Sequence, residues 1–457
     1  MQDNIILKTD SYKLSHYQQY PPGTEGIYSY FESRAGTEYD EVVFFGLQYI
    51  LQKHLEGAVV TQEAIDVAEA ITNIHLGTGM FNRNGWMRIL DKHYGKLPVR
   101  IKAVPEGTVV PKNNVLMTIE NTDPQLPWLS NYLETLLVQT WYPSTVATVS
   151  RDVKRSILYY LEKTGDPSLI DFKLHDFGFR GATTEEAAGI GGLAHLVNFK
   201  GSDTLPAIAV GISHYYSGIC GHSIPASEHS TITSWGKDRE VDAFRNMLQQ
   251  YPTSMLACVS DSFDIFKACE DLWGTQLHEE VLSREHPLVV RPDSGEIVST
   301  VLKVLSILGD KFGYTLNKKQ YKLLNPAVRI IQSDGCSPKT IAAVLDEMEI
   351  KGWSADNIVF GMGGGLLQKV NRDTAAFAFK CSAINIGGVW SDVWKDPVTD
   401  TGKRSKRGRL ALKRNLDGQF TTLPEDEVEL DQLQTVFENG EILKLTTLND
   451  IRKNAKL

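Results

Sequence analysis

Four aspartates could place carboxylates around one ligand, because each follows a short apolar run of the chain. They are Asp203, Asp261, Asp293 and Asp334. Carboxylates that gather around a phosphate group hold sugar hydroxyls or Mg²⁺, or they stabilise a developing cation. Taken singly, each is more often a helix N-cap, because Asp-Ser and Asp-Gly are common cap and turn sequences. Their shared position at the ends of apolar runs favours a functional site, although one of the four could still be only a cap.

A glycine triplet, Gly363 to Gly365, directly follows the apolar run NIVF. The backbone N–H groups of such a turn can approach an anion closely, and a following helix adds its positive end. The alternative is a tight left-handed turn without a ligand. Downstream basic residues favour an anion; they are Arg372 and Lys380, followed by the cluster Lys403, Arg404, Lys406, Arg407 and Arg409. Such a cluster is usually a solvated loop or a targeting patch, but in an acidic chain it would also suit a mobile clamp for a polyphosphate.

His229 follows Glu228 at the end of another run, SIPASEHS. A single histidine is more often a hydrogen-bonded structural residue. Its position and the flanking carboxylate, which could fix its tautomer, favour a nucleophile or an acid–base group. Metal binding by His214, His222 and His229 is disfavoured, because their spacing matches no zinc pattern. Aromatic residues that could stack a flat ring, rather than fill a core, are Phe177 and Phe179, beside Arg180, and also Tyr12.

The elements that must position these residues follow a regular cadence from about residue 171. Seven apolar runs end in polar residues or glycine every 26 to 41 residues, the length of one strand and one covering helix. With an eighth run, AFKCSAINIGG, they predict an α/β fold in which repeated βα units close into a barrel, with the chemistry at the carboxyl ends of the strands. An open Rossmann-like sheet is the alternative, but the G-x-G-x-x-G and P-loop patterns are missing. Before this region, residues 99–123 predict antiparallel strands and residues 126–140 a helix.

Composition narrows the class of protein. The chain has 457 residues, 42% of them hydrophobic and 23% charged, which is typical of a globular protein of two or three domains. Its net charge of −9 argues against a nucleic-acid partner. The five cysteines are scattered, and the first residues contain no apolar signal-peptide core. No run reaches the roughly 18 apolar residues of a membrane span. We therefore expect a cytoplasmic enzyme without a membrane partner.

Long motifs resemble the nicotinamide phosphoribosyltransferase family nearly from end to end. They are TDSYKLSHYQQYPP (9–22), YSYFESR (28–34), LHDFGFRG (174–181), NFKGSDT (198–204), EHSTITSWGKD (228–238), VSDSFDI (259–265), RPDSG (291–295), GGGLLQK (363–369) and KRSKRGRL (403–410). The resemblance implies a type II phosphoribosyltransferase, a homodimer with active sites at the subunit interface. It implies an irregular α/β barrel over 146–384 and a second α+β domain with antiparallel strands over 1–145 and 385–457. The implied reaction joins nicotinamide to phosphoribosyl pyrophosphate, giving nicotinamide mononucleotide and pyrophosphate, with Mg²⁺ and with optional coupling to ATP.

The resemblance also implies roles for individual residues. Phe177 would stack on one face of nicotinamide, Tyr12 of the partner subunit on the other, and Asp203 would face the amide. The residues implied near the phosphoribosyl phosphate are Arg180, Asp334, Gly363, Gly364 and Arg372. Those implied for ribose, pyrophosphate and nucleotide phosphates are Arg291, Asp293, Arg34, Lys380, Lys395 and Lys403. His229 would be phosphorylated by ATP, and we expect it to be catalytic together with Asp261 and Asp293, whose carboxylates would help the ribosyl cation to form.

The sequence departs from the family pattern at three places. Ser333-Asp334-Gly335 replaces Gly-Asp-Gly, Ala378 stands where animal members carry serine, and the loop 35–40 is shorter. Nicotinate phosphoribosyltransferase is the sister alternative, but a carboxylate at position 203 would repel nicotinate. A non-enzymatic binding protein on the same fold is disfavoured by the polar strand ends. An aldolase-type enzyme would need a Schiff-base lysine, for which Lys380 is the candidate.

Overall fold

The computed structural model describes residues 4–399 and 404–457. The chain divides into two compact units. The antiparallel unit comprises Met1–Thr148, Ser213–Ser217 and Asn371–Lys456, and the parallel unit comprises Val149–Ile212 and Gly218–Val370. The resemblance implied boundaries at 145/146 and 384/385, whereas the units of the structure change at 148/149 and 370/371. No helix in the described ranges is both long and apolar enough to cross a membrane.

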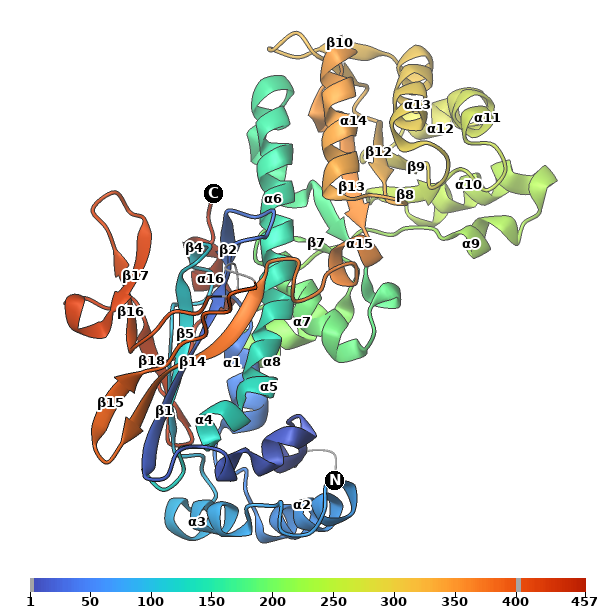
Figure 1. Cartoon of the computed structure of the whole chain (residues 1–457). Coiled ribbons are helices and arrows are strands. Elements are labelled where there is room, and N and C mark those ends of the chain that lie inside the picture. The colour runs from blue at the N-terminus through green and yellow to red at the C-terminus, as the bar shows by residue number, and fades with distance from the viewer. Residues whose placement is uncertain (1–3, 400–403) are drawn as a thin grey trace. The chain divides into compact units, whose positions relative to one another are not determined.

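The antiparallel unit is built on one seven-stranded sheet, in the order β15-β14-β1-β5-β3-β18-β19 (Figure 1). Its strands are β1 (Thr24–Ser33), β3 (Val99–Ala103), β5 (Val115–Asn121), β14 (Phe377–Ile386), β15 (Val389–Asp392), β18 (Gln434–Glu438) and β19 (Glu441–Ile442). The predicted antiparallel strands within 99–123 are confirmed, since β3 pairs antiparallel with β5. Between them, β4 (Val109–Pro111) pairs with β2 (Glu41–Val43), and a further hairpin joins β16 (Leu410–Arg414) to β17 (Phe420–Pro424).

The helix predicted over 126–140 is broken into short pieces. The structure has α4 (Leu129–Tyr132), α5 (Glu134–Leu137) and η4 (Val138–Thr140), and the long helix α6 (Trp141–Thr164) follows. The residues at the junctions of the pieces, Leu133 and Val138, keep helical backbone angles. Leu129, Leu136 and Leu137 are spaced to share one helical face, and all three are buried.

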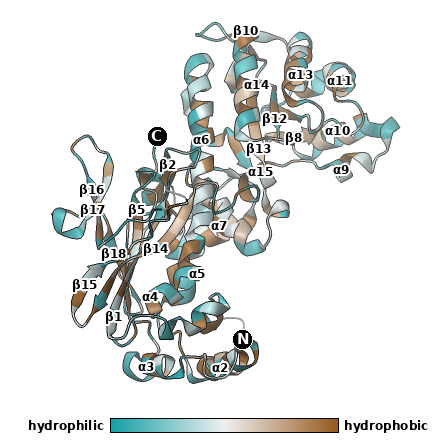
Figure 2. Cartoon of the chain, viewed as in Figure 1, coloured by the Kyte–Doolittle hydropathy of each residue, from teal (hydrophilic) through white to brown (hydrophobic). Residues whose placement is uncertain are grey.

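The parallel unit carries a six-stranded parallel sheet in the order β7-β6-β13-β12-β9-β8. Its strands are β6 (Leu174–Asp176), β7 (Gly201–Ser202), β8 (Leu256–Val259), β9 (Leu288–Arg291), β12 (Val328–Gln332) and β13 (Ile358–Met362). The four longer strands, β8, β9, β12 and β13, are mostly apolar, as expected for parallel strands covered on both faces (Figure 2). Ala257, Val289 and Ile331 form a buried hydrophobic cluster on one face of this sheet. Phe177, Ile224 and Val359 pack against the cluster.

A seventh segment, 222–227, links the two edges of this sheet. On one side His222 forms a parallel bridge with Gly201 of β7, and on the other Ala226 forms one with Ala257 of β8. The backbone N–H of Ser202 donates to the His222 carbonyl at 3.1 Å, and that of Ser227 to the Ala257 carbonyl at 3.0 Å. The sheet is therefore curled, and the predicted α/β fold with an irregular barrel and separate antiparallel strands is confirmed.

The eighth apolar run is not a barrel strand. AFKCSAINIGG contains β14, which pairs antiparallel with β1 from Thr24↔Ile386 to Ser33↔Phe377. The prediction was wrong because a local apolar pattern does not record which strand will be the hydrogen-bonding partner. Membership of β14 in the antiparallel sheet also moves the second boundary between the units from 384/385 to 370/371.

Helices follow the strands of the parallel unit, and several of them begin at side-chain caps. The main ones are α7 (Glu185–Leu196), α10 (Glu240–Gln250), α13 (Ile297–Phe312) and α14 (Pro338–Ile350). Thr184 caps α7, Glu296 caps α13, and Ser337 forms a capping box with Thr340 at the start of α14. Figure 1 shows α13 and α14 side by side, and they contact each other. These helices hold the strand ends in register, which fixes the loops described next.

Candidate active site

The carboxyl ends of the parallel strands carry most of the residues that the sequence singled out. Asp203 directly follows β7, and Gly363 directly follows β13. Asp261, Asp293 and Asp334 each lie two residues beyond a strand, namely β8, β9 and β12. Because parallel strands end at one edge of their sheet, these side chains share that edge.

Helix capping does not account for these carboxylates. The helix after Asp261, α11 (Ile265–Lys267), is capped by Asp264, whose side chain accepts two helix N–H groups. The helix after Asp293 is capped by Glu296, and the helix after Asp334 by Ser337. The alternative explanation as caps therefore fails for Asp261, Asp293 and Asp334.

Asp203 is held by two hydrogen-bond donors on the same carboxylate oxygen. His175 Nε2 lies 2.9 Å from Asp203 Oδ1, and the Ser223 hydroxyl donates to the same atom. Burial opposes the charged form of Asp203, but the hydrogen bonds and positive field of His175, the Ser223 hydroxyl and the charge of Arg291 lower its pKa overall. Asp203 is therefore an ionised carboxylate. Sequence reasoning missed His175, although it lies two residues before Phe177 and the alternation of a strand puts both on one face.

Phe177 is fixed by packing on the apolar face of the parallel sheet. Its ring contacts the cluster of Ala257, Val289 and Ile331. It also lies over Gly361, where an added Cβ would fall 2.2 Å from the ring. The His175 ring is tilted against it, with centroids 4.7 Å apart. The structure therefore places an immobilised aromatic ring next to the carboxylate of Asp203 and its histidine partner.

Arg291, Asp293 and Ser333 form a second polar group at the ends of β9 and β12. Arg291 Nη2 lies 3.5 Å from Asp293 Oδ2, and the Ser333 hydroxyl donates to Asp293 Oδ1 at 2.6 Å. Arg291 Nε is buried without a hydrogen-bond partner in the described part of the chain. The departure from the family pattern at position 333 thus adds a donor that orients Asp293, and Arg291 keeps an N–H group for a ligand.

His229 and Asp261 form a third pair. His229 begins α9 (His229–Thr233), and its Nε2 lies 2.9 Å from Asp261 Oδ1. The Asp261 side chain is 4% exposed, whereas that of His229 is 47% exposed. The sequence suggested Glu228 as the partner of the histidine, but the Glu228 carboxylate accepts from the Ser230 hydroxyl instead. Asp261 therefore holds Nε2, and Nδ1 is left for chemistry.

Each of these three pairs joins the ends of neighbouring strands. His175 and Asp203 come from β6 and β7, and Asp293 and Ser333 come from β9 and β12. His229 and Asp261 follow segment 222–227 and β8, which are linked by the bridge at Ala226. Adjacent strands lie about 4.8 Å apart, so side chains just beyond their ends are within hydrogen-bonding reach.

The glycine turn lies against the segment that carries Arg180. A Cβ on Gly181 would be 3.4 Å from the Cα of Gly364, so the short helix η6 (Phe179–Gly181) packs beside the turn. Arg180 is exposed there, as is Asp334 at the end of β12. Exposed charges of opposite sign near open backbone N–H groups suit a polar ligand.

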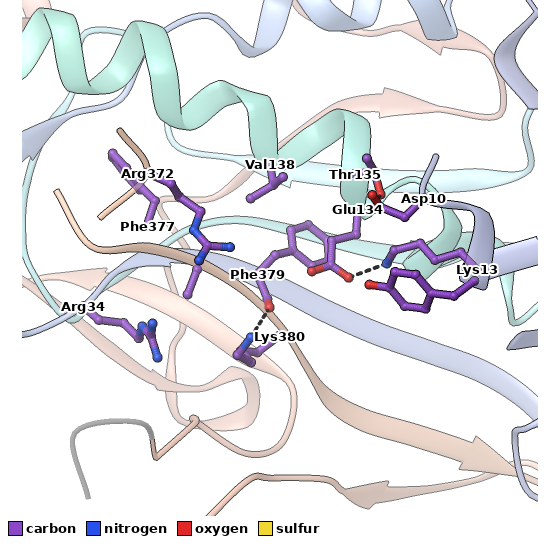
Figure 3. A pocket seen from close by; sticks show the side chains of 12 residues that line it. Asp10, Lys13, Arg34, Glu134, Thr135, Val138, Arg372, Phe377, Phe379 and Lys380 are labelled. Carbon is purple, nitrogen blue, oxygen red and sulfur yellow. Dashed lines mark hydrogen bonds and ion pairs between the residues drawn. The ribbon is translucent and has the colours of Figure 1, made fainter. Parts of the chain in front are cut away.

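The other predicted basic residues line a pocket in the antiparallel unit. Its walls are formed by Asp10, Tyr12, Lys13, Arg34, Glu134, Thr135, Val138, Arg372, Phe377, Ala378, Phe379 and Lys380. Figure 3 shows the side chains of Arg34, Arg372 and Lys380 extending toward the same space. Lys13 is buried and paired with Glu134 at 2.6 Å, and Tyr12 is 58% exposed. The pocket thus concentrates positive charge beside an exposed aromatic ring.

Lys380 and Arg34 are the least compensated cations of this pocket. Burial lowers the pKa of Lys380; Glu134 opposes this, and the nearby charges of Arg34, Arg372 and Lys395 lower it further. Arg34 Nε is buried without a hydrogen-bond partner in the described ranges. An anion bound here would relieve the repulsion among these cations, so the pocket fits a phosphate or pyrophosphate group.

The downstream basic cluster is not a free clamp in its described members. Arg404 pairs with Asp396 at 2.6 Å, Lys406 with Glu32, and Arg407 with Asp392 at 3.9 Å. Arg409 lies 2.7 Å from both Glu120 and Glu425. These cations are already balanced by carboxylates, which corrects the expectation of a mobile polyphosphate clamp. Lys395 contacts this loop through its backbone, bonded to Ser405, and Lys403 lies outside the described residues.

Comparison with known proteins identifies the family. The sequence model described as "Nicotinate phosphoribosyltransferase (NAPRTase) family" matches residues 172–441, and that described as "Nicotinamide phosphoribosyltransferase, N-terminal domain" matches residues 4–101. The nicotinamide phosphoribosyltransferase of Xanthomonas campestris is 51% identical over 464 residues, covering 99% of this chain and 98% of that protein. That of Acinetobacter baylyi is 32% identical, covering 98% and 96%.

A solved structure agrees with the fold. The nicotinate-nucleotide pyrophosphorylase from Pyrococcus furiosus superimposes with a TM-score of 0.63 at 17% identity, covering 100% of this chain and 95% of that one. Half of all positions are identical to the Xanthomonas protein over nearly the whole length of both chains. The chain therefore belongs to the nicotinamide phosphoribosyltransferase family, a family of pentosyltransferase enzymes.

Proposed function

We propose that this chain is a cytoplasmic enzyme of NAD salvage that transfers the 5-phosphoribosyl group of phosphoribosyl pyrophosphate to nicotinamide. The observation that carries the proposal is the ionised Asp203 beside the immobilised ring of Phe177. A flat pyridine ring stacks on Phe177, and its carboxamide N–H group donates to the carboxylate of Asp203.

The charge of Asp203 selects the amide over the acid. Nicotinate would bring a second negative charge to this carboxylate, and at about 4 Å with an effective dielectric constant of about 20 the repulsion is about 4 kcal/mol. The Asp203 side chain is 41% exposed, so solvent reduces the discrimination to about one or two decades in kcat/KM. The sister activity on nicotinate is the alternative, and the same assay decides between them.

The other groups serve the ribosyl and phosphate parts of the second substrate. Arg291 and Asp293 hold the ribose and the pyrophosphate, and the glycine turn with Arg180 holds the 5-phosphate. As the anomeric carbon loses pyrophosphate it becomes cationic, and the strand-end carboxylates stabilise it. The pyridine nitrogen attacks with its own lone pair, so no general base is required. The cationic pocket of Arg34, Arg372 and Lys380 binds the departing pyrophosphate.

Mg²⁺ fits this arrangement as a substrate-borne ion. Among the described residues, no group of three or more His, Cys, Asp or Glu side chains could hold a metal by itself. Mg²⁺ is usually bound by one or two carboxylates together with substrate phosphates, and Asp261 and Asp293 at the strand ends would supply them. When bound, the ion neutralises charge on the leaving pyrophosphate.

ATP coupling is proposed to act through His229. Asp261 occupies Nε2, which leaves Nδ1 as the nucleophile for the γ-phosphoryl group. A phosphohistidine at this edge would add negative charge near the pyrophosphate and its Mg²⁺ and help to order them. His229→Ala should keep ATP-independent synthesis and lose stimulation by ATP. If ATP stimulated His229→Ala as much as wild type, coupling through a phosphohistidine would be refuted.

The active site is proposed to be shared within a homodimer, because Tyr12 is exposed and suited to stack on the second face of the base. Phe177→Ala and Tyr12→Ala should each be nearly inactive alone. Mixing them, after dissociation and reassembly, should restore activity in dimers that combine one intact Phe177 with one intact Tyr12. Mixed dimers without restored activity would argue that each subunit works alone.

The direct test of the proposed function is one assay. The enzyme is supplied with phosphoribosyl pyrophosphate, Mg²⁺ and either nicotinamide or nicotinate, with and without ATP, and mononucleotide formation is followed. We expect a higher kcat/KM with nicotinamide, and Asp203→Asn should narrow the difference. A wild-type preference for nicotinate would favour the sister activity, and no product from either base would refute the proposal.

A further inference from the structure

The two oxygens of the Asp203 carboxylate have different hydrogen-bond partners. Its Oδ1 takes both His175 Nε2, at 2.9 Å, and the Ser223 hydroxyl. In the described part of the chain no donor engages Oδ2. One oxygen is therefore saturated by protein groups, and the other is left for a ligand.

His175 can hold the Asp203 carboxylate in this orientation because its ring is packed between two neighbours. It lies in the middle of β6 and is 13% exposed. On one side Gly201 approaches so closely that an added Cβ would lie 2.7 Å from His175 Nδ1. On the other side the Phe177 ring lies at 4.7 Å between centroids, tilted by 35°. A ring confined in this way aims Nε2 at Asp203 with little freedom to turn.

We propose that His175 and Ser223 are positioning residues that determine base selectivity, by fixing Asp203 so that only Oδ2 faces the carboxamide. This inference rests on the proposed function and adds the residues that set its base selectivity. Held through Oδ1 in this way, the carboxylate turns Oδ2 to the ligand, where it accepts the carboxamide N–H and repels the carboxylate of nicotinate. Both hydrogen bonds also favour the ionised form of Asp203, in line with its lowered pKa.

Without these donors Asp203 would lose both its orientation and part of its preference for ionisation. A rotated carboxylate would meet the amide poorly, and a protonated one could donate a hydrogen bond to nicotinate. The amide does not take part in bond formation at the ring nitrogen. The loss should therefore appear in KM for nicotinamide and in selectivity, more than in kcat at saturation.

The test compares the ratio of kcat/KM for nicotinamide to that for nicotinate in His175→Ala, His175→Gln and Ser223→Ala. Removing one hydrogen bond to a charged group should reduce the ratio by about ten- to a hundredfold in His175→Ala and by a smaller factor in Ser223→Ala. His175→Gln places an amide N–H near the position of Nε2 and should recover much of the ratio. His286→Ala is the matched control and should behave as wild type. His286 lies just before β9, at the amino end of that strand and away from the carboxyl ends that carry the site.

The outcomes separate this inference from the proposed function. A wild type that uses neither base refutes the proposed function itself. A selective wild type with an unchanged ratio in folded His175→Ala overturns the inference and leaves the function standing. If His175→Ala does not fold, an unchanged ratio in Ser223→Ala has the same meaning. A fall in the ratio that His175→Gln reverses supports the positioning role, because a purely structural defect would lower both activities together.

Discussion

Asp261→Asn tests whether the carboxylate on His229 has a chemical role. When Nδ1 accepts a phosphoryl group the imidazole becomes cationic, and the carboxylate 2.9 Å from Nε2 stabilises that charge. Asparagine keeps the size and an acceptor oxygen but removes the charge. A hydrogen bond to a charged group is worth about 1.5–3 kcal/mol. Because His229 is about half exposed, water weakens the interaction, and we take the lower end, which corresponds to about tenfold in rate.

The assay measures the rate at which His229 acquires phosphate from ATP, together with the stimulation of mononucleotide synthesis by ATP. We expect the phosphorylation rate to fall about tenfold in Asp261→Asn, and the stimulation by ATP, expressed relative to the variant's own synthesis without ATP, to fall by a similar factor. Glu228→Gln is the matched control, because Glu228 adjoins His229 in sequence but accepts from the Ser230 hydroxyl. Equal phosphorylation in Asp261→Asn and wild type, or an equal loss in Glu228→Gln, would refute the reasoning.

Three further predictions follow from individual contacts. Burial raises the pKa of Glu106 to about 7 from an ordinary 4.5. The folded protein therefore holds the carboxyl proton of Glu106 more tightly than the unfolded chain does. As the pH rises from 4.5 to about 7, the free energy of unfolding should fall by about 3 kcal/mol. Glu106→Gln should remove that decline in denaturant titrations, and an equal decline in the variant would contradict it. The pKa of Lys380 is lowered, so this lysine loses its proton and its charge at a less alkaline pH than an ordinary lysine. The affinity for phosphoribosyl pyrophosphate should weaken as that happens. In Lys380→Arg, which stays charged, the KM should not change over the same pH range. Ser333→Ala removes the 2.6 Å hydrogen bond to Asp293 and should raise the KM for phosphoribosyl pyrophosphate by about three- to tenfold; an unchanged KM would show that Asp293 needs no such support.

Much of the parallel unit could be predicted from the sequence, because its strands are short apolar runs at regular intervals. The first seven runs all take part in the curled sheet, the third as segment 222–227 with only isolated bridges. The eighth looked the same, yet β14 pairs with β1, more than 300 residues earlier in the chain. Burial on both faces gives a strand the same pattern in either kind of sheet, so sheet membership could not be read locally.

The sequence by itself determined which chemical groups this protein places at its strand ends, and the family to which it is similar, because those depend on residue types and their order. Only the tertiary structure decided which groups work together. It paired His229 with Asp261 rather than with adjacent Glu228, joined His175 to Asp203, and paired the described members of the downstream basic cluster with carboxylates. The physical reason is that the strand-end pairs form across neighbouring strands, where hydrogen bonding brings together residues 28, 32 and 40 positions apart that no local pattern connects.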